Sequence, residues 1–131
     1  MEHKIEIVKV VTTDDIVNIL SCEAGGFDYW AQLDAQESIY DKHKAQLTKE
    51  IPIGTTICYE NILAHILEHG GAIDVCDYEE DEHYDLTLEK LLNGIKLNAI
   101  NRPDDADIGN GDAATADCIL QYAIFGDVIY G

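Results

Sequence analysis

The chain has 131 residues, of which 47% are apolar, and 26 acidic residues against 8 basic ones give it a formal charge of −18. This charge repels nucleic acid and anionic membranes, and no apolar run approaches the ~20 residues that span a bilayer. We therefore expect one soluble, cytoplasmic domain over residues 1–131 that binds neither nucleic acid nor membranes.

The first part of the chain predicts a strand, a helix and an aromatic core segment. Residues 4–11 alternate and are rich in β-branched side chains, which is typical of a strand. Thr12, with Asp15 three residues later, indicates a helix start, and the glycines at 25–26 indicate its end. Residues 27–30 hold the only tryptophan and are expected to anchor the core. The apolar residues of the predicted helix are Ile16, Val17, Ile19 and Leu20.

The middle of the chain predicts a second helix and a hairpin. Residues 31–51 are polar and mixed in charge, and we expect an irregular or partly helical excursion there. The threonines at 55–56 cap a helix that ends at the glycines at 70–71. Residues 72–78 alternate as a strand, and an acidic turn leads to a second strand at 83–86, which predicts a β-hairpin. The apolar face of the helix comprises Ile57, Cys58, Ile62, Leu63, Ile66 and Leu67.

The last part of the chain predicts two more helices. Thr87 is a suitable N-cap for a helix through Leu97, and Gly94 within it costs about 1 kcal/mol relative to alanine. Thr115 opens a fourth helix that Gly126 ends, and residues 127–130 add a closing strand. The order of elements favours an α+β fold, in which about four helices pack an antiparallel sheet that includes a hairpin near 72–87.

The cysteines and the absence of catalytic motifs limit the functions that we expect. The N-terminal residues are followed by no apolar leader, so we expect an intracellular protein with reduced thiols, mostly buried as small apolar groups. No P-loop, dinucleotide-binding fingerprint or nucleophile elbow is present. We therefore predict neither an enzyme nor a cofactor. The four cysteines, none paired as CxxC, are Cys22, Cys58, Cys76 and Cys118.

Two segments contain residue types that bind metals. His65 and His69, four residues apart on one predicted helix, offer two imidazoles for zinc in the order His-x-x-Glu-His. Spacing marks no third ligand, although Glu23 and Glu89 are candidates, and His69 also suits a helix C-terminus. The Asp-rich loop 101–112 offers oxygens for calcium but departs from the EF-hand pattern. We favour no metal site, with a solvated turn at 101–112.

Acidic side chains concentrate in two further places. Six lie between residues 77 and 85, in and around the predicted hairpin turn, where we expect them to project together into solvent. Such a patch either keeps the turn soluble or docks a basic partner through salt-sensitive steering. The candidate partner-binding residues are Asp77, Glu79, Glu80, Asp81, Glu82 and Asp85, with Asp104, Asp105 and Asp107 as a second patch.

Four segments resemble a family of small, uncharacterised phage and prophage proteins. They are Ala24–Trp30, Glu68–Gly71, Tyr84–Gly94 and Ala116–Gly131. The resemblance implies a phage or mobile-element setting, and hence the cytoplasm of a host cell. It brings no function that transfers to this chain.

Three functions remain open. We rank first a non-enzymatic phage protein whose acidic surface binds the basic surface of a host protein, as a DNA mimic inhibits a restriction or CRISPR defence protein. The second is a structural or accessory phage protein that acts as an oligomer. The third is a small metal-dependent enzyme that uses His65 and His69.

Overall fold

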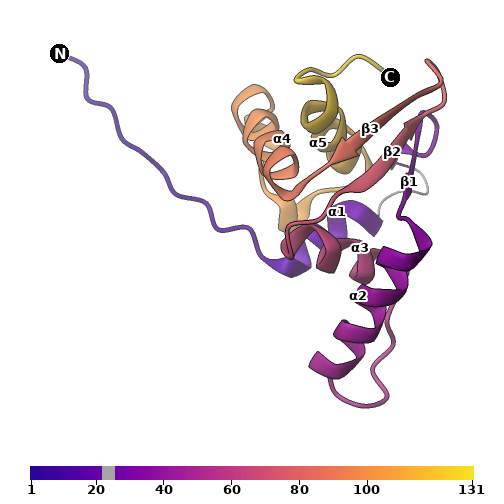
Figure 1. Cartoon of the computed structure of the whole chain (residues 1–131). Helices are drawn as coiled ribbons and strands as arrows, with labels where there is room; N and C mark the ends of the chain where they lie inside the picture. Colours follow the sequence, from indigo (N-terminus) through magenta and orange to yellow (C-terminus); the bar gives the residue numbers. More distant parts are fainter. Residues whose placement is uncertain (22–25) are drawn as a thin grey trace.

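The computed structural model describes residues 1–21 and 26–131, and it confirms an α+β fold with one small sheet. Helices α4 and α5 lie together beside the sheet, whereas α2 projects from the opposite end of the molecule (Figure 1). The elements are α1 (Thr13–Ser21), β1 (Ala31–Asp34), α2 (Glu37–Glu50), α3 (Tyr59–Glu68), β2 (Ile73–Asp77), β3 (Glu82–Leu86), α4 (Leu88–Asn101), the short 3-10 helices η2 (Pro103–Asp105) and η3 (Ile108–Asn110), and α5 (Ala113–Phe125).

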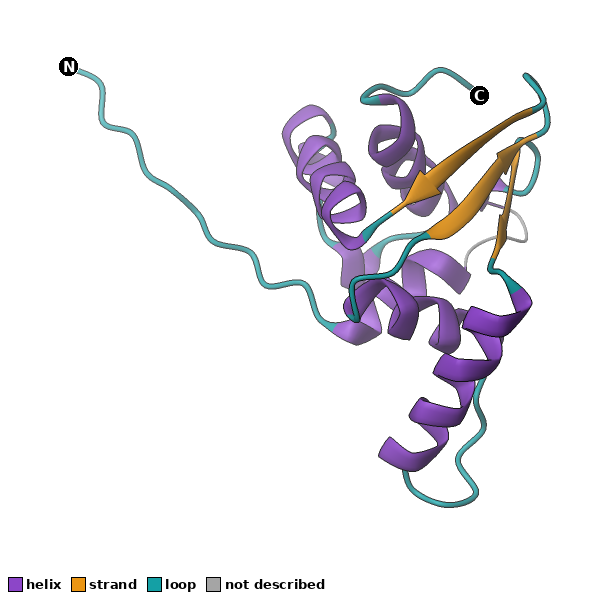
Figure 2. Cartoon of the chain, viewed as in Figure 1, coloured by secondary structure: helices purple, strands orange, loops and turns teal. Residues whose placement is uncertain are grey.

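The sheet is antiparallel with strand order β1-β2-β3 (Figure 2). The β2–β3 hairpin confirms the prediction, with Ile73 opposite Leu86 and Asp77 opposite Glu82. Strand β1 was not predicted, because it is only four residues long and lies in the polar segment that we expected to be irregular or partly helical. It pairs Ala31 with Asp77, and its buried and exposed positions alternate.

Two predicted strands are absent from the structure. Residues 4–11 form an extended arm, most of which projects from the domain (Figures 1 and 2), and Ile5 and Ile7 are more than 80% exposed. At its base, Lys9 donates to the backbone carbonyl of Ala106 and Val11 packs against the core. Alternation alone does not make a strand, because the ladder needs a neighbour. Residues 127–130 are also not a strand. The side-chain oxygen of Gln121 instead accepts hydrogen bonds from the backbone N–H groups of Ile129 and Tyr130, each at 2.8 Å.

The helix boundaries follow capping chemistry. Thr12 and Asp15 bond each other's backbone N–H groups, as predicted. Thr87 accepts from the N–H of Lys90, which confirms the predicted cap of α4. In contrast, α3 starts after Cys58 and α5 after Asp112, not at the threonines that we expected. Of the predicted glycine stop after α1, residue 25 lies outside the described part of the chain. Among the described residues, no helix is both long and apolar enough to cross a bilayer.

The core confirms the aromatic anchor. Phe27 and Trp30 are fully buried, and the Trp30 indole N–H donates to Asp117 at 2.7 Å. Gly94 is where α4 meets α5, because a Cβ there would lie 2.6 Å from the carbonyl oxygen of Ile119. The expected burial of the cysteines is not observed. Cys58 is exposed, Cys76 and Cys118 are half-buried, and Cys22 lies outside the described residues.

Candidate metal centre

The hairpin carries only part of the predicted acidic patch. Asp77 is fully buried, so the expectation that it projects into solvent is wrong. Its carboxylate accepts from the backbone N–H groups of Glu79 and Glu80 and from the Tyr130 hydroxyl at 2.8 Å. Burial and this hydrogen bond raise the pKa of the Tyr130 hydroxyl. Asp77 therefore holds the turn in shape, while Glu79, Glu80, Asp81, Glu82 and Asp85 are exposed.

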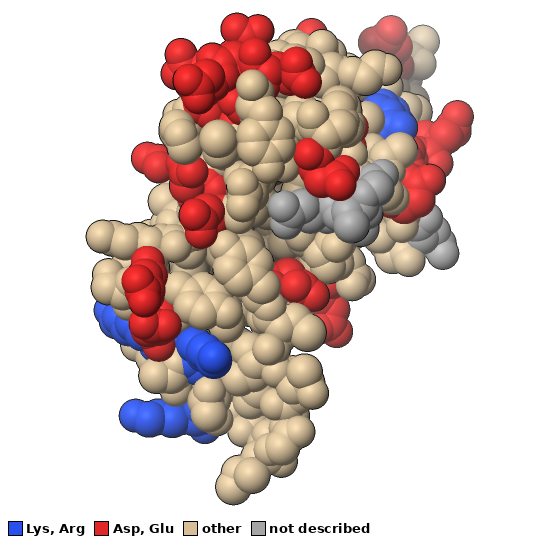
Figure 3. Space-filling view, turned by 90° about the vertical axis from the view of Figure 1, so that its right-hand side faces the viewer, with Lys and Arg blue, Asp and Glu red and all other residues tan. Residues whose placement is uncertain are grey.

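The second acidic patch is also divided. Asp105 is ion-paired with Arg102 at 2.7 Å and accepts the Thr115 hydroxyl at 2.5 Å, so its role is structural. Asp107 caps η3 through the N–H of Gly109, and Asp104 is exposed. Figure 3 shows the carboxylates of one face in several separate groups, the largest at the height of the hairpin turn, with much of the positive charge at the opposite end. The acidic residues visible on this face do not form one continuous band.

Three histidines come together between α2 and α3. One ring nitrogen from each of His43, His65 and His69 lies within 4.8 Å of the others. The rings of His65 and His69 stack with centroids 3.9 Å apart, and the ring of His43 meets that of His65 edge-on at 5.1 Å. Within residues 1–21 and 26–131, this is the only group of three or more histidines, cysteines or carboxylates with metal-ligand spacing.

Helical geometry explains the cluster. His65 and His69 are one turn apart at the C-terminal end of α3, as the sequence indicated. His43 was missed, because residues 31–51 contain few apolar side chains and were expected to be irregular or only partly helical, so no helical face was assigned there. The signal was nevertheless present. Ile39, Tyr40, His43 and Leu47 recur at helical spacing, and His43 is the one buried residue of α2.

Hydrogen bonds fix the positions of the protons in the cluster. A carboxylate only accepts, so Nε2 of His65 donates to Glu50 at 3.1 Å. With His65 neutral, its Nδ1 is the acceptor for Nδ1 of His43 at 2.8 Å. Nδ1 of His69 donates to the backbone carbonyl of His65 at 2.8 Å, which leaves a lone pair on Nε2 of His69. Lone pairs therefore remain on Nε2 of His43 and of His69.

The environment of His43 disfavours its protonated form. Burial lowers the pKa of His43 from its ordinary value, and the nearby His65, His69 and Lys42 lower it further. His43 is only 8% exposed, so water does little to offset this effect. The neutral imidazole is the form that binds a metal ion.

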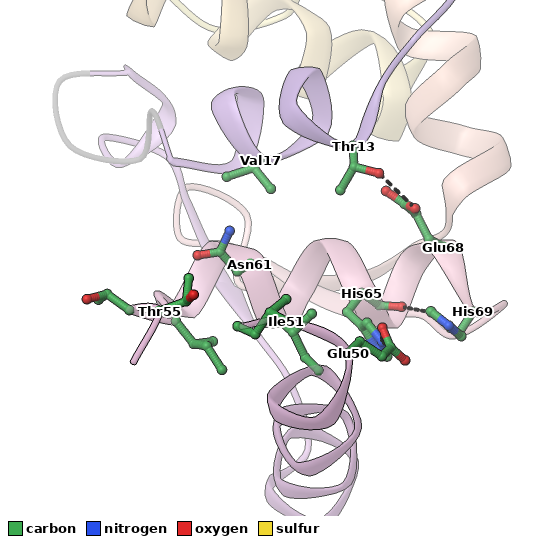
Figure 4. A pocket seen from close by; sticks show the side chains of 12 residues that line it. Thr13, Val17, Glu50, Ile51, Thr55, Asn61, His65, Glu68 and His69 are labelled. Carbon is green, nitrogen blue, oxygen red and sulfur yellow. Dashed lines mark hydrogen bonds and ion pairs between the residues drawn. The ribbon is translucent and has the colours of Figure 1, made fainter. Parts of the chain in front are cut away.

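A cleft of about 310 Å³ opens beside the cluster (Figure 4). His65 and His69 lie at one end of it with Glu50, and Glu68 accepts a hydrogen bond from Thr13 across the cleft at 3.1 Å. His43 does not line the cleft and reaches the cluster from α2. The histidine cluster thus has one side in the α2–α3 interface and one side toward open space.

The other candidate ligands are not part of this group. Glu23 lies outside the described residues, and Glu89 belongs to the first turn of α4. The loop proposed for calcium folds into η2 and η3, where Asp105 and Asp107 serve local contacts. Comparisons of the chain with protein-family models, with curated proteins and with solved structures found no match.

Proposed function

We propose that this protein binds a transition-metal ion of the zinc class through His43, His65 and His69. The observation that carries the proposal is the convergence of three ring nitrogens, two of them from well-buried side chains, within 4.8 Å. Nitrogens that share a tetrahedral zinc ion at Zn–N distances of about 2.0–2.1 Å lie roughly 3.3 Å apart. Metal binding would therefore require ring rotations that bring the most distant pair of nitrogens up to about 1.5 Å closer.

The hydrogen bonds around the rings support this proposal. Metal-bound histidines usually donate their other N–H to a carboxylate or a backbone carbonyl, which fixes the ring for ligation. His65 donates to Glu50, and His69 donates to the carbonyl of His65. An ion bound to the lone pair on Nδ1 of His65 would displace the N–H of His43 that this nitrogen now accepts, and His43 would keep that proton on Nδ1 and offer the lone pair of its Nε2.

Ligand chemistry selects the class of ion. Three imidazoles suit zinc, copper, nickel and cobalt, whereas calcium and magnesium prefer a shell of oxygens. We infer a site that binds one zinc-class ion and ties α2 to α3. This proposal differs from the expectation drawn from the sequence, which favoured no metal site.

The test is metal uptake by full-length protein prepared without a histidine tag. We expect one cobalt ion per chain, with the visible absorption of a four-coordinate centre, and displacement of cobalt by zinc. His69→Ala should weaken uptake strongly, and its exposed position makes loss of folding a small concern. His83→Ala is the matched control, because His83 lies on the hairpin and bonds Asp74. Absence of uptake, or equal uptake by both variants, contradicts the proposal.

A second candidate function is docking of a basic host protein at the hairpin turn, in a phage setting. The observation that favours it is the exposure of four consecutive acids, Glu79–Glu82, on a turn that buried Asp77 holds in shape. A fixed cluster of like charges steers a basic partner and loses effect as salt rises. The separate acidic groups in Figure 3 fit local docking better than mimicry of a duplex.

This second candidate is tested with an oligolysine probe. We expect binding at low salt that falls as ionic strength rises, and a marked loss when Glu79, Glu80 and Glu82 are changed to Gln. An equal number of Gln substitutions at Glu37, Asp41 and Glu60, all outside the hairpin, controls for net charge. Equal weakening in the two variants would mean that the probe senses only total charge.

A further inference from the structure

The cleft beside the histidine cluster has the character of a small-molecule site. Its volume of about 310 Å³ lies at the lower end of the ~300–1,000 Å³ of ligand pockets. Half-buried apolar side chains from α1, from the end of α2 and from the segment before α3 line it together with a few polar groups. The apolar ones are Val17, Leu47, Ile51 and Ile57, and the polar ones include Thr13, Thr55, Thr56 and Asn61.

The three histidines would leave a coordination position unfilled on a tetrahedral ion. The nearest carboxylates already have other partners, since Glu50 accepts from His65 and Glu68 accepts from Thr13. His43 approaches from the α2–α3 interface, whereas His65 and His69 line the cleft. The unfilled position therefore belongs on the cleft side.

The net charge at the metal end of the cleft limits the charge of the ligand. A divalent ion with three neutral imidazoles carries +2, and Glu50 and Glu68 at the same end of the cleft bring the local sum to zero. A single negative charge on a ligand gains from direct coordination. A dianion such as phosphate adds a second charge beside two carboxylates, in a chain of formal charge −18.

We propose that the metal-loaded cleft binds a small apolar monoanion, whose carboxylate takes the open coordination position and whose hydrocarbon body fills the apolar part of the cleft. This inference rests on the proposed metal site and names the ligand class of that site. The metal supplies the attraction for the head group, and the side chains of Ile51 and Ile57 supply the apolar contact.

The experiment is calorimetric titration of 4-phenylbutanoate into the full chain, after zinc loading has been measured in the same sample. We expect the affinity for 4-phenylbutanoate to fall roughly 10-fold or more when zinc is absent. Three control ligands should bind more weakly to a similar degree: 4-phenylbutan-1-ol lacks the carboxylate, acetate lacks the hydrocarbon body, and inorganic phosphate carries excess negative charge and has no hydrocarbon body. Ile51→Asn should keep zinc uptake and weaken 4-phenylbutanoate several-fold. Ile53→Asn is the matched control, because Ile53 is fully exposed and does not line the cleft.

The outcomes separate the two proposals. Zinc uptake without 4-phenylbutanoate binding overturns the ligand class and leaves the metal site standing. Equal binding with and without zinc, or phosphate binding as tight as that of 4-phenylbutanoate, also overturns it. Absence of zinc uptake overturns both, and the zinc titration shows this before any ligand is added.

Discussion

Replacing His43 by alanine should lower the stability of the protein in two distinguishable ways. Without metal, the variant loses the hydrogen bond to His65, worth about 1 kcal/mol, and the packing of a buried ring. Truncation of well-packed side chains costs about 2–5 kcal/mol, and we take the low end because α2 packs mainly against α3. We therefore expect a loss of roughly 2–3 kcal/mol in the free energy of unfolding.

With metal, the difference should widen. Zinc at 100 times its dissociation constant adds about 2.7 kcal/mol to the stability of a protein that binds it only when folded. The wild type gains this increment, and His43→Ala gains little because one of three ligands is missing. The gap between the two proteins then grows to roughly 5 kcal/mol, the sum of the metal-free loss and the metal increment.

The assay is urea unfolding followed by far-ultraviolet circular dichroism, once in chelator and once in zinc. His83→Ala serves as the control, since His83 is exposed and its ring bonds Asp74 across the hairpin, away from the histidine cluster. Its small effect should be the same in both conditions. If zinc stabilises His43→Ala as much as it stabilises the wild type, the ligand set is wrong.

Three further predictions concern the rest of the domain. Gly94→Ala should destabilise the protein by about 1–3 kcal/mol in urea unfolding despite the helical preference for alanine, because its Cβ would lie 2.8 Å from that of Ala123; a stabilised variant would refute the close α4–α5 contact. Asp77→Ala should lower the free energy of unfolding by about 1–3 kcal/mol, whereas Glu80→Ala should change it by no more than about 0.5 kcal/mol, as measured by thermal unfolding. Equal effects of the two substitutions would contradict the structural role of Asp77. Burial lowers the pKa of His43 below 6.5, so the unfolded chain takes up a proton that the folded chain resists, and stability in chelator should fall as pH drops below about 6.5. Unfolding midpoints between pH 7.5 and 5 should show that His43→Gln removes this fall, and an unchanged slope would refute its origin.

Local signals in the sequence were sufficient for much of the fold. The hairpin was predictable because Ile73 and Val75 alternate with polar residues before an acidic turn, and α4 because Thr87 precedes an apolar helical face. The same alternation of buried and exposed positions also predicts the burial of Asp77. It places Asp77 on the inner face with Ile73 and Val75, where a carboxylate survives only if it is hydrogen-bonded. Because acidic residues follow it directly, Asp77 was grouped with the exposed turn and not with the inward-facing positions of the strand.

The candidate site was half predictable. The spacing of His65 and His69 is a property of one helix, and the sequence displays it directly. The third histidine depends on how α2 packs against α3, a contact between residues more than 20 positions apart that no local pattern specifies. The arm at 4–11 shows the converse. Its pattern satisfies every local requirement of a strand, and the domain provides no neighbouring strand for it in the described structure.

The exposed arm gives the protein two opposite responses to ionic strength. Contacts made by carboxylates at the hairpin weaken when salt is added, because counter-ions screen them. The arm exposes Ile5, Ile7, Val8 and Val10, and the formal charge of −18 should make two copies of the domain repel each other. Screening removes that barrier while leaving apolar attraction and backbone pairing intact. Self-association should therefore rise under the same high-salt conditions that would release the basic partner proposed for the hairpin.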